Sequence, residues 1–204
     1  AIYGKKEFGK TNLLSLLLDG LVQQAEELRM VFFDDGRNQL KFLYDKYSSE
    51  CDCVLINGFE KRDLPMKDGT VITGRKLSPI QQFYLYLNEN YIELDKRFLA
   101  GIYGVSDALR KEYENIPDCT AEETPFTVFV IQSKLVYLNT PEGKRFINSI
   151  LPQLTAVAEE RGFLFIFSDV QKISDGEQNS FFNNNISYAF LLDNIAEFAG
   201  ERGQ

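Results

Sequence analysis

Near its start the chain reads Gly4-Lys5-Lys6-Glu7-Phe8-Gly9-Lys10-Thr11, which matches the pattern G-x-x-x-x-G-K-[ST] at every fixed position. The two glycines allow the backbone to curl so that successive N–H groups face inward around a phosphate. The stretch follows the apolar strand end Ile2-Tyr3 and precedes a leucine-rich segment that is typical of a helix. The spacing therefore predicts a phosphate-binding loop between a strand and a helix.

This pattern assigns a role to most of its residues. The Lys10 side chain is expected to reach the β and γ phosphates, and the Thr11 hydroxyl to ligate Mg²⁺. The helix that begins near Lys10 adds the positive end of its dipole. We therefore predict ATP with Mg²⁺ as the ligands, with Thr11 as the metal ligand. The predicted nucleotide-binding residues are Gly4, Lys5, Lys6, Glu7, Phe8, Gly9, Lys10, Thr11 and Asn12.

Composition limits what else the chain can do. Its 204 residues, 44% hydrophobic and 25% charged, predict a single globular domain over residues 1–204. A formal charge of −8 argues against a domain that binds nucleic-acid phosphates. The absence of histidine excludes Ser-His-Asp and Cys-His nucleophiles and every metal site that contains histidine. No apolar run approaches the roughly 20 residues of a membrane-spanning helix.

The alternation of elements predicts an α/β fold with a mostly parallel sheet and helices on both faces. Strands are expected at 2–3, 28–33, 54–56, 126–131, 164–167 and 187–192. A helix over 11–22, apolar nearly all round, is predicted to be buried on most sides. A long helix capped by Ser78 is predicted to run as far as Phe98, and a helix over 147–161 tolerates Pro152 only near its start or at a kink. Residues 65–74 are expected to be a polar connection.

The strand over 126–131 ends without an acid. An ATPase needs a carboxylate at the tip of a central strand to hold Mg²⁺ through water, but here the tip reads Gln132-Ser133-Lys134. The other candidate acids are Asp34, Asp35 and Asp169, each of which is equally typical of a turn at a strand end. We therefore predict nucleotide binding with impaired hydrolysis and assign no catalytic residue.

The order of these motifs resembles that of the FtsK/SpoIIIE-type motor domains. Within that family it is most similar to the tandem ATPase modules of the type VII secretion coupling proteins EssC and EccC. The likeness is carried by residues 2–14, by 32–36, by 91–98 with Gly104-Val105, by the strand over 126–131 and by 161–167. The resemblance implies a RecA-like P-loop NTPase fold.

The departures from the family are as informative as the matches. Gln132-Ser133 replaces the family's acidic pair, and Ser168-Asp169-Val170 stands where a Thr-Gln sensor is usual. The resemblance therefore implies a degenerate C-terminal module that acts in substrate recognition or in regulation of the translocation motor. An active motor that takes its carboxylate from Asp34, Asp35, Asp169 or a neighbouring module is the alternative, and a DNA translocase is a more distant one.

The resemblance also implies a setting and partners. The chain is expected to be a fragment of a larger multidomain protein that other segments anchor in a bacterial membrane, with this domain in the cytoplasm. Its partners would be the neighbouring ATPase modules of the same chain and small helical WXG-motif substrates, with no nucleic acid. Phe181-Phe182 is a candidate contact surface, although the two rings fit packing under their own loop equally well, and Tyr84, Tyr86 and Tyr91 suit either core or contact. Cys51-Asp52-Cys53 offers too few ligands for zinc and indicates reduced thiols.

Overall fold

The computed structural model of the protein describes residues 2–4, 9–34, 36–72, 74, 76–104, 116, 125–132, 141–168 and 190–192. Four strands form one sheet in the order β3-β2-β8-β9, in which every neighbouring pair runs parallel. These strands are β2 (Leu28–Phe33), β3 (Asp52–Ile56), β8 (Phe126–Gln132) and β9 (Phe163–Ser168). The predicted α/β class with a parallel sheet is confirmed, with β3 beginning at Asp52 rather than at residue 54.

The two inner strands explain why the sheet forms. Strand β8 lies between β2 and β9, and its residues 128–131 are fully buried. Strand β2 carries four consecutive fully buried residues, 30–33. Continuous apolar runs of this kind are stable only where helices cover both faces of a parallel sheet. Parallel neighbours also need crossover connections, which the helices provide.

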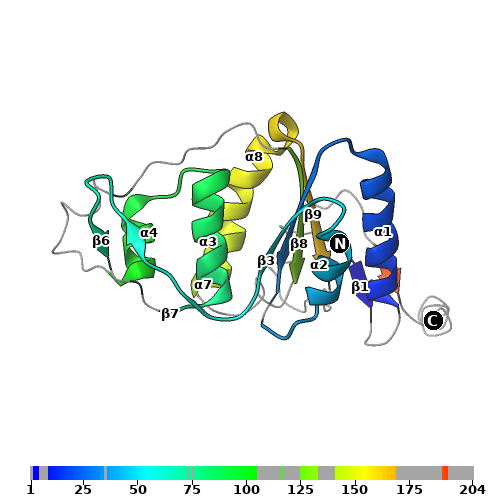
Figure 1. Cartoon of the computed structure of the whole chain (residues 1–204), viewed down its shortest axis with the longest axis horizontal. Coiled ribbons are helices and arrows are strands. Elements are labelled where there is room, and N and C mark those ends of the chain that lie inside the picture. The colour runs from blue at the N-terminus through cyan, green and yellow to red at the C-terminus, as the bar shows by residue number, and fades with distance from the viewer. Residues whose placement is uncertain are drawn as a thin grey trace, which may run out of the picture.

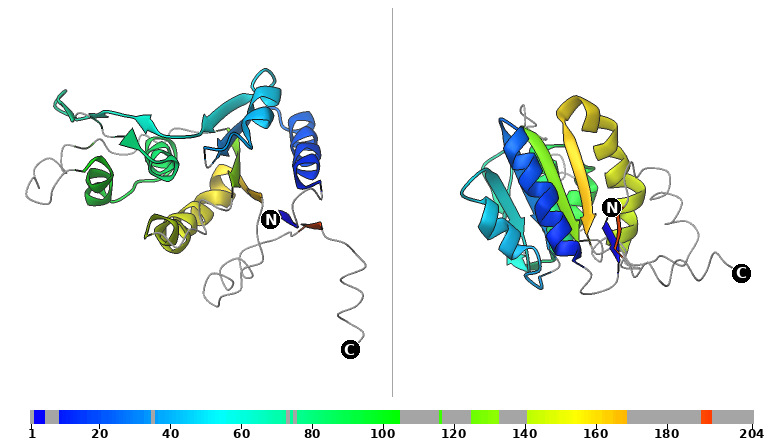
Figure 2. Two further views of the ribbon diagram at one scale, coloured as in Figure 1. Left: turned by 90° about the horizontal axis from the view of Figure 1, so that it is seen from below. Right: turned by 90° about the vertical axis from the view of Figure 1, so that its right-hand side faces the viewer.

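A second parallel ladder joins segments from near the two ends of the chain. Strand β1 (Ile2–Gly4) pairs with β10 (Phe190–Leu192). Strand β1 also contacts β9, so the ladder lies beside that edge of the four-stranded sheet. The right-hand view of Figure 2 shows β1 and β10 there, near the end of β9. The strands predicted at both ends of the sequence are thus present, at 2–4 and 190–192.

Helices cover both faces of the sheet, as predicted (Figure 1). The α3 face is covered by α3 (Pro79–Asn90) and by the continuous helical segment α7 (Pro141–Arg145), η1 (Phe146–Ile150) and α8 (Leu151–Arg161), while α4 (Lys96–Tyr103) lies on the far side of α3 from the sheet. The α1 face is covered by α1 (Lys10–Gln24) and the short helix α2 (Lys41–Tyr47), which the sequence analysis did not predict. Each face has its own buried apolar cluster.

The prediction that the first helix is buried on most sides was wrong for α1. Leu14 and Leu18 are buried against the sheet, whereas Leu16 is 68% exposed and faces away from it. The helix lies in the outer layer, so only one stripe of its leucines meets the core. Neither α1 nor any other helix in the described part of the chain has the length and apolar character needed to cross a membrane.

The long helix predicted as far as Phe98 is two helices, and that prediction was also wrong. The Ser78 cap with its Gln81 capping box is present, but α3 ends at Asn90. The chain then turns: the Asn88 side-chain oxygen accepts from the backbone N–H of Leu94, and the Asp95 carboxylate accepts from that of Phe98 to begin α4. The helical spacing of apolar residues continues from α3 into α4 because both helices pack on one core. The three tyrosines left open above, Tyr84, Tyr86 and Tyr91, belong to that core or pack against it.

The predicted polar connection is a two-part antiparallel ribbon. Strand β4 (Glu60–Lys61) pairs with β7 (Lys76–Leu77), and β5 (Leu64–Pro65) pairs with β6 (Val71–Ile72). Gly74 allows the two sides of the ribbon to come close together, since a Cβ at that position would lie 1.5 Å from the backbone oxygen of Arg62. Figure 1 shows the ribbon beside α3 and α4, far from α1. Strand pairs this short leave too little periodicity for a sequence pattern to detect.

Pro152 lies where the last described helical segment, residues 141–161, changes its hydrogen bonding. The helix begins at Pro141 rather than at residue 147, and its π-helical turn η1 immediately precedes α8. The backbone N–H of Leu151 donates to the oxygen of Phe146, five residues earlier, and Pro152 has no N–H to continue an α-helical pattern. The expected position of this proline, at a helix start or a kink, is confirmed.

Candidate functional site

Gly9 shapes the start of α1. It has a left-handed backbone conformation with φ 75° and ψ 17°, and its carbonyl accepts the first helical hydrogen bond, from the N–H of Leu13 at 3.0 Å. A Cβ at Gly9 would meet no atom within 4 Å, so the backbone conformation, not a lack of space, calls for glycine there. Gly9 has no side chain to cap the helix, so the first N–H groups of α1 receive no side-chain acceptor from their N-cap residue. A helix start of this kind is compatible with anion binding.

The structure describes five of the nine predicted nucleotide-binding residues. Gly4 ends β1, and Gly9 precedes the first residues of α1, Lys10, Thr11 and Asn12. Lys10 is half-buried, while Thr11 and Asn12 are exposed. The other four predicted residues (Lys5, Lys6, Glu7 and Phe8) lie outside the described residues.

The start of α1 lies at the edge where the parallel strands end. Helix α1 runs back along the sheet from this edge, and β2 begins four residues after the helix ends at Gln24. In Figure 1 the first turn of α1 lies next to β1, toward the ends of β8 and β9. From β1 the chain crosses through α1 to β2, whereas β10 pairs on the other side of β1. Ligands of open α/β sheets bind at this edge, where neighbouring connections diverge.

The tip of β8 carries a buried amide. Gln132 is 1% exposed, and its side-chain nitrogen donates to the side-chain oxygen of Gln39. It pairs in register with Ser168 at the end of β9, whose hydroxyl lies 3.5 Å from the carbonyl oxygen of Ile131. Ser133, the next residue at the predicted magnesium position, lies outside the described residues. The described end of this strand therefore presents neutral groups.

Asp34, one of the three alternative acids, has a structural task. It follows β2 and is fully buried. One carboxylate oxygen accepts from the backbone N–H groups of residues 36, 37 and 38 at 2.9–3.2 Å, and the other accepts from that of Leu40 at 2.7 Å. The carboxylate therefore fixes the loop that leads into α2 and is engaged by backbone donors rather than offered to a metal. Asp35 and Asp169 lie outside the described residues.

Two further amides at this edge were missed by the sequence analysis. The side-chain nitrogen of Asn57, just after β3, donates to the side-chain oxygen of Asn38, which has a left-handed φ of 61°. The side-chain oxygen of Asn57 is buried and has no hydrogen-bond partner among the described residues. The sequence could have indicated a left-handed turn at Asn38, because asparagine tolerates that conformation and Asp-Asp-Gly precedes it. It could not have indicated that Asn57, on a different strand end, is the partner of Asn38. The described polar groups at the ends of β2, β3, β8 and β9 thus include amides, a serine hydroxyl and one carboxylate engaged by backbone donors.

The described start of α1 is compatible with the phosphate half of the predicted nucleotide site. A left-handed glycine, a helix start and an adjacent lysine suit a phosphate. No group of three or more Cys, Asp or Glu side chains that could hold a metal occurs among the described residues. Thr11, the residue predicted to ligate Mg²⁺, is exposed in the first turn of α1.

Comparison of the chain with protein-family models, with curated proteins and with solved structures finds no match. The interpretation of the site therefore rests on its own residues and their geometry. The proposed contact pair Phe181-Phe182 lies outside the described residues.

Proposed function

We propose that this chain is a nucleotide-binding module in which Gly4 to Asn12 hold the phosphates of ATP and hydrolysis is impaired. The observation that carries the proposal is the complete G-x-x-x-x-G-K-[ST] pattern between the end of β1 and the start of α1, with Gly9 in the left-handed conformation. A RecA-like P-loop fold is part of the proposal, and a parallel sheet covered on both faces is compatible with it.

Impaired hydrolysis follows from the residue at the end of β8. Gln132 can neither ligate Mg²⁺ as an anion nor accept a proton from water, and its side-chain nitrogen is directed to Gln39. Asp34 is held by four backbone N–H groups. ATP would therefore act through binding, as a ligand that favours one shape of the domain.

The biological role proposed here rests on the resemblance to FtsK/SpoIIIE-type modules. In that role the domain works in the bacterial cytoplasm as part of a membrane-anchored type VII secretion coupling protein. It recognises small helical WXG-motif substrates or regulates the neighbouring ATPase modules of its own chain. The acidic charge of −8 favours a protein partner over DNA.

Calorimetric titration of ATP with Mg²⁺ tests the nucleotide site. Replacing Lys10 with Ala removes a charge-assisted contact to phosphate, so affinity should fall about 10- to 100-fold. Lys41→Ala is the matched control, because Lys41 is an exposed lysine on α2 bound to Asp45 at 2.7 Å. Equal affinities in the parent chain and the Lys10 variant would contradict the proposal.

A hydrolysis assay on the same proteins distinguishes a binding module from a motor. The proposal predicts no turnover above the blank for the isolated chain. Steady turnover that disappears in Lys10→Ala would instead identify an active motor, with its carboxylate at Asp35 or Asp169. Single Asn substitutions at those two positions would then find it.

A further inference from the structure

Two cysteine side chains touch at the beginning of β3. Cys51 precedes the strand and Cys53 is its second residue, so both project to the same side of the extended chain. Their sulfur atoms are 3.6 Å apart, and both residues are half-buried against the apolar cluster of the α1 face. A disulfide has a sulfur–sulfur distance of about 2.05 Å, so the two atoms need to approach by only about 1.5 Å.

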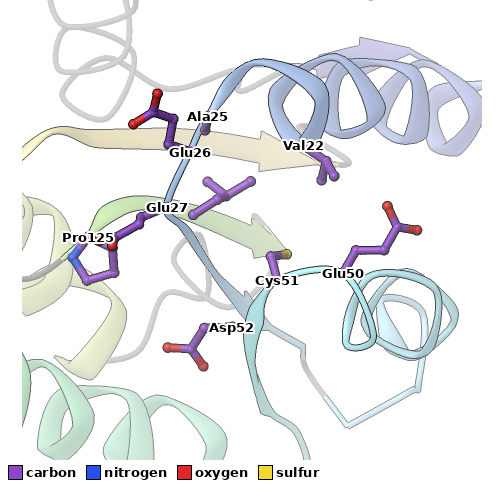
Figure 3. A pocket seen from close by; sticks show the side chains of 9 residues that line it. Val22, Ala25, Glu26, Glu27, Glu50, Cys51, Asp52 and Pro125 are labelled. Carbon is purple, nitrogen blue, oxygen red and sulfur yellow. The ribbon is translucent and has the colours of Figure 1, made fainter.

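Cys51 also lines a pocket of about 340 Å³ at the edge of the sheet where β2, β3 and β8 begin, opposite the start of α1. Figure 3 shows its side chain among the lining residues, of which none is basic. The apolar part of the lining is formed by Val22, Ala25, Leu28 and Pro125. The charged part consists of four carboxylates, Glu26, Glu27, Glu50 and Asp52, of which Asp52 is bound by the Arg29 side chain at 2.6 Å. A small molecule that reaches Cys51 through this pocket meets a negative field, which favours a cation.

We propose that Cys51 and Cys53 form a redox-active dithiol and that small cationic disulfides oxidise it through this pocket. The site is separate from the proposed nucleotide site and does not depend on it. Its specificity comes from the excess of negative charge that Glu26, Glu27 and Glu50 give the pocket, and its chemistry comes from the contact between the two sulfurs.

The reaction is a two-step exchange. The Cys51 thiol loses its proton, and the thiolate attacks one sulfur of the disulfide RSSR. A Cys51–SR bond forms and the first RS⁻ leaves, to be protonated to RSH. Cys53 then loses its proton and attacks the Cys51 sulfur, which forms the Cys51–Cys53 bond and expels the second RS⁻. The dithiol gives up two electrons and two protons, and RSSR becomes two RSH.

The surroundings of the two sulfurs explain why Cys51 reacts first. Burial raises the pKa of the Cys51 thiol, and it raises that of Cys53 further, to about 12. The nearby carboxylates Glu50 and Asp52 add to the increase at Cys51. A cation held among these carboxylates offsets their field, so it favours the Cys51 thiolate where it is needed. An anionic disulfide has the opposite effect.

The test compares three disulfides on the full chain carrying Cys119→Ser, which leaves only the proposed pair. Cystamine is a dication, bis(2-hydroxyethyl) disulfide is neutral and glutathione disulfide is an anion. Intact mass and peptide mapping should show the loss of two hydrogen atoms and a Cys51–Cys53 bond. At low ionic strength cystamine should react about tenfold faster than the neutral disulfide, and glutathione disulfide more slowly still. Added salt should compress these differences.

Variants separate the two parts of the proposal. Cys53→Ser should accumulate a stable mixed disulfide on Cys51, and Cys53→Ala provides the same test if the serine variant does not fold. Combined Glu27→Gln and Glu50→Gln should reduce the preference for cystamine, whereas Glu60→Gln, an exposed site on β4 outside the pocket lining, should not. Equal rates with all three disulfides would overturn the specificity. Reaction only after unfolding in urea, or a mixed disulfide that persists beside an intact Cys53, would overturn the dithiol itself.

Discussion

The two faces of the sheet are held to their helices in different ways. On the α3 face the core is built from stacked and edge-on rings: Phe83 stacks on Phe33 with ring centroids 4.3 Å apart and also contacts Phe129 and Phe146. On the α1 face the cluster is mainly aliphatic, and α1 meets it through one stripe of leucines. The proposed phosphate loop precedes α1 and therefore belongs to the face with the lighter apolar packing.

Polar contacts supplement the packing of the α1 face. The Asp34 carboxylate fixes the loop before α2. The Tyr47 hydroxyl of α2 lies 2.8 Å from the Asp19 carboxylate and 2.9 Å from the Ser15 carbonyl oxygen, both on α1, and Lys46 donates to the same carboxylate. We therefore expect the α3 face to supply most of the stability, while directional polar contacts add to the packing of the α1 face.

The largest effect is expected from Phe83→Ala on the α3 face. The ring is fully buried with aromatic neighbours on several sides, so its loss leaves a cavity and should lower the free energy of unfolding by about 4 kcal/mol. Phe59→Ala is the control, since that ring is 66% exposed and its loss should cost under about 0.5 kcal/mol. Urea unfolding followed by circular dichroism measures both. Similar losses in the two variants would mean that the α3 face is not the main source of stability.

Two leucines of one helix probe the α1 face. Leu18 is fully buried and Leu16 is 68% exposed, so Leu18→Ala should cost about 3 kcal/mol and Leu16→Ala less than about 0.5 kcal/mol. Because both substitutions remove the same atoms from one helix, differences in helix propensity cancel. A large loss at Leu16 would show that a further contact covers the outer side of α1.

Sequence reasoning succeeded where one physical signal dominated. The continuous apolar run of β8 predicted a central parallel strand and the apolar residues of β2 predicted a strand, and the position of Gly9 predicted a special backbone conformation before a helix. It failed where distant contacts decide the outcome. Asn88 and Asp95 end one helix and begin another inside an unbroken apolar pattern, and the β4–β7 ribbon depends on the close approach at Gly74.

The candidate site likewise contains residues that the sequence placed correctly and residues whose roles required the fold. The motif located its described residues from Gly9 to Asn12 at the start of α1. The sequence also placed an amide rather than an acid at the end of β8, but could not find its partner Gln39, because that contact joins residues 93 positions apart. Asp34 was open to two interpretations until its four backbone donors were located. Such assignments require the fold, since the competing roles use the same residue type.

Asp34→Asn tests the first of the polar contacts. The substitution keeps the shape but replaces one acceptor oxygen with a donor, so either Leu40 or the 36–38 backbone faces an N–H group instead of an oxygen. The expected loss is about 2 kcal/mol. Asp45→Asn on α2, an exposed residue paired with Lys41, should change stability by less than about 0.5 kcal/mol. If the two variants are equally stable, the loop before α2 is held by something other than this carboxylate.

Tyr47→Phe should have the smallest effect, and it tests most directly whether polar contacts hold α2 to α1. Burial raises the pKa of Tyr47, so the hydroxyl stays protonated at neutral pH and donates toward α1. Removing it while keeping the buried ring should cost about 1 kcal/mol. Tyr44→Phe is the control, because Tyr44 is on the same helix as Tyr47 and its ring packs edge-on against Phe32 of β2.

Combining Tyr47→Phe with Asp19→Asn should cost less than the sum of the two single changes, because both remove one shared contact between α1 and α2. Strict additivity would mean that the Tyr47–Asp19 hydrogen bond contributes nothing to holding these two helices together.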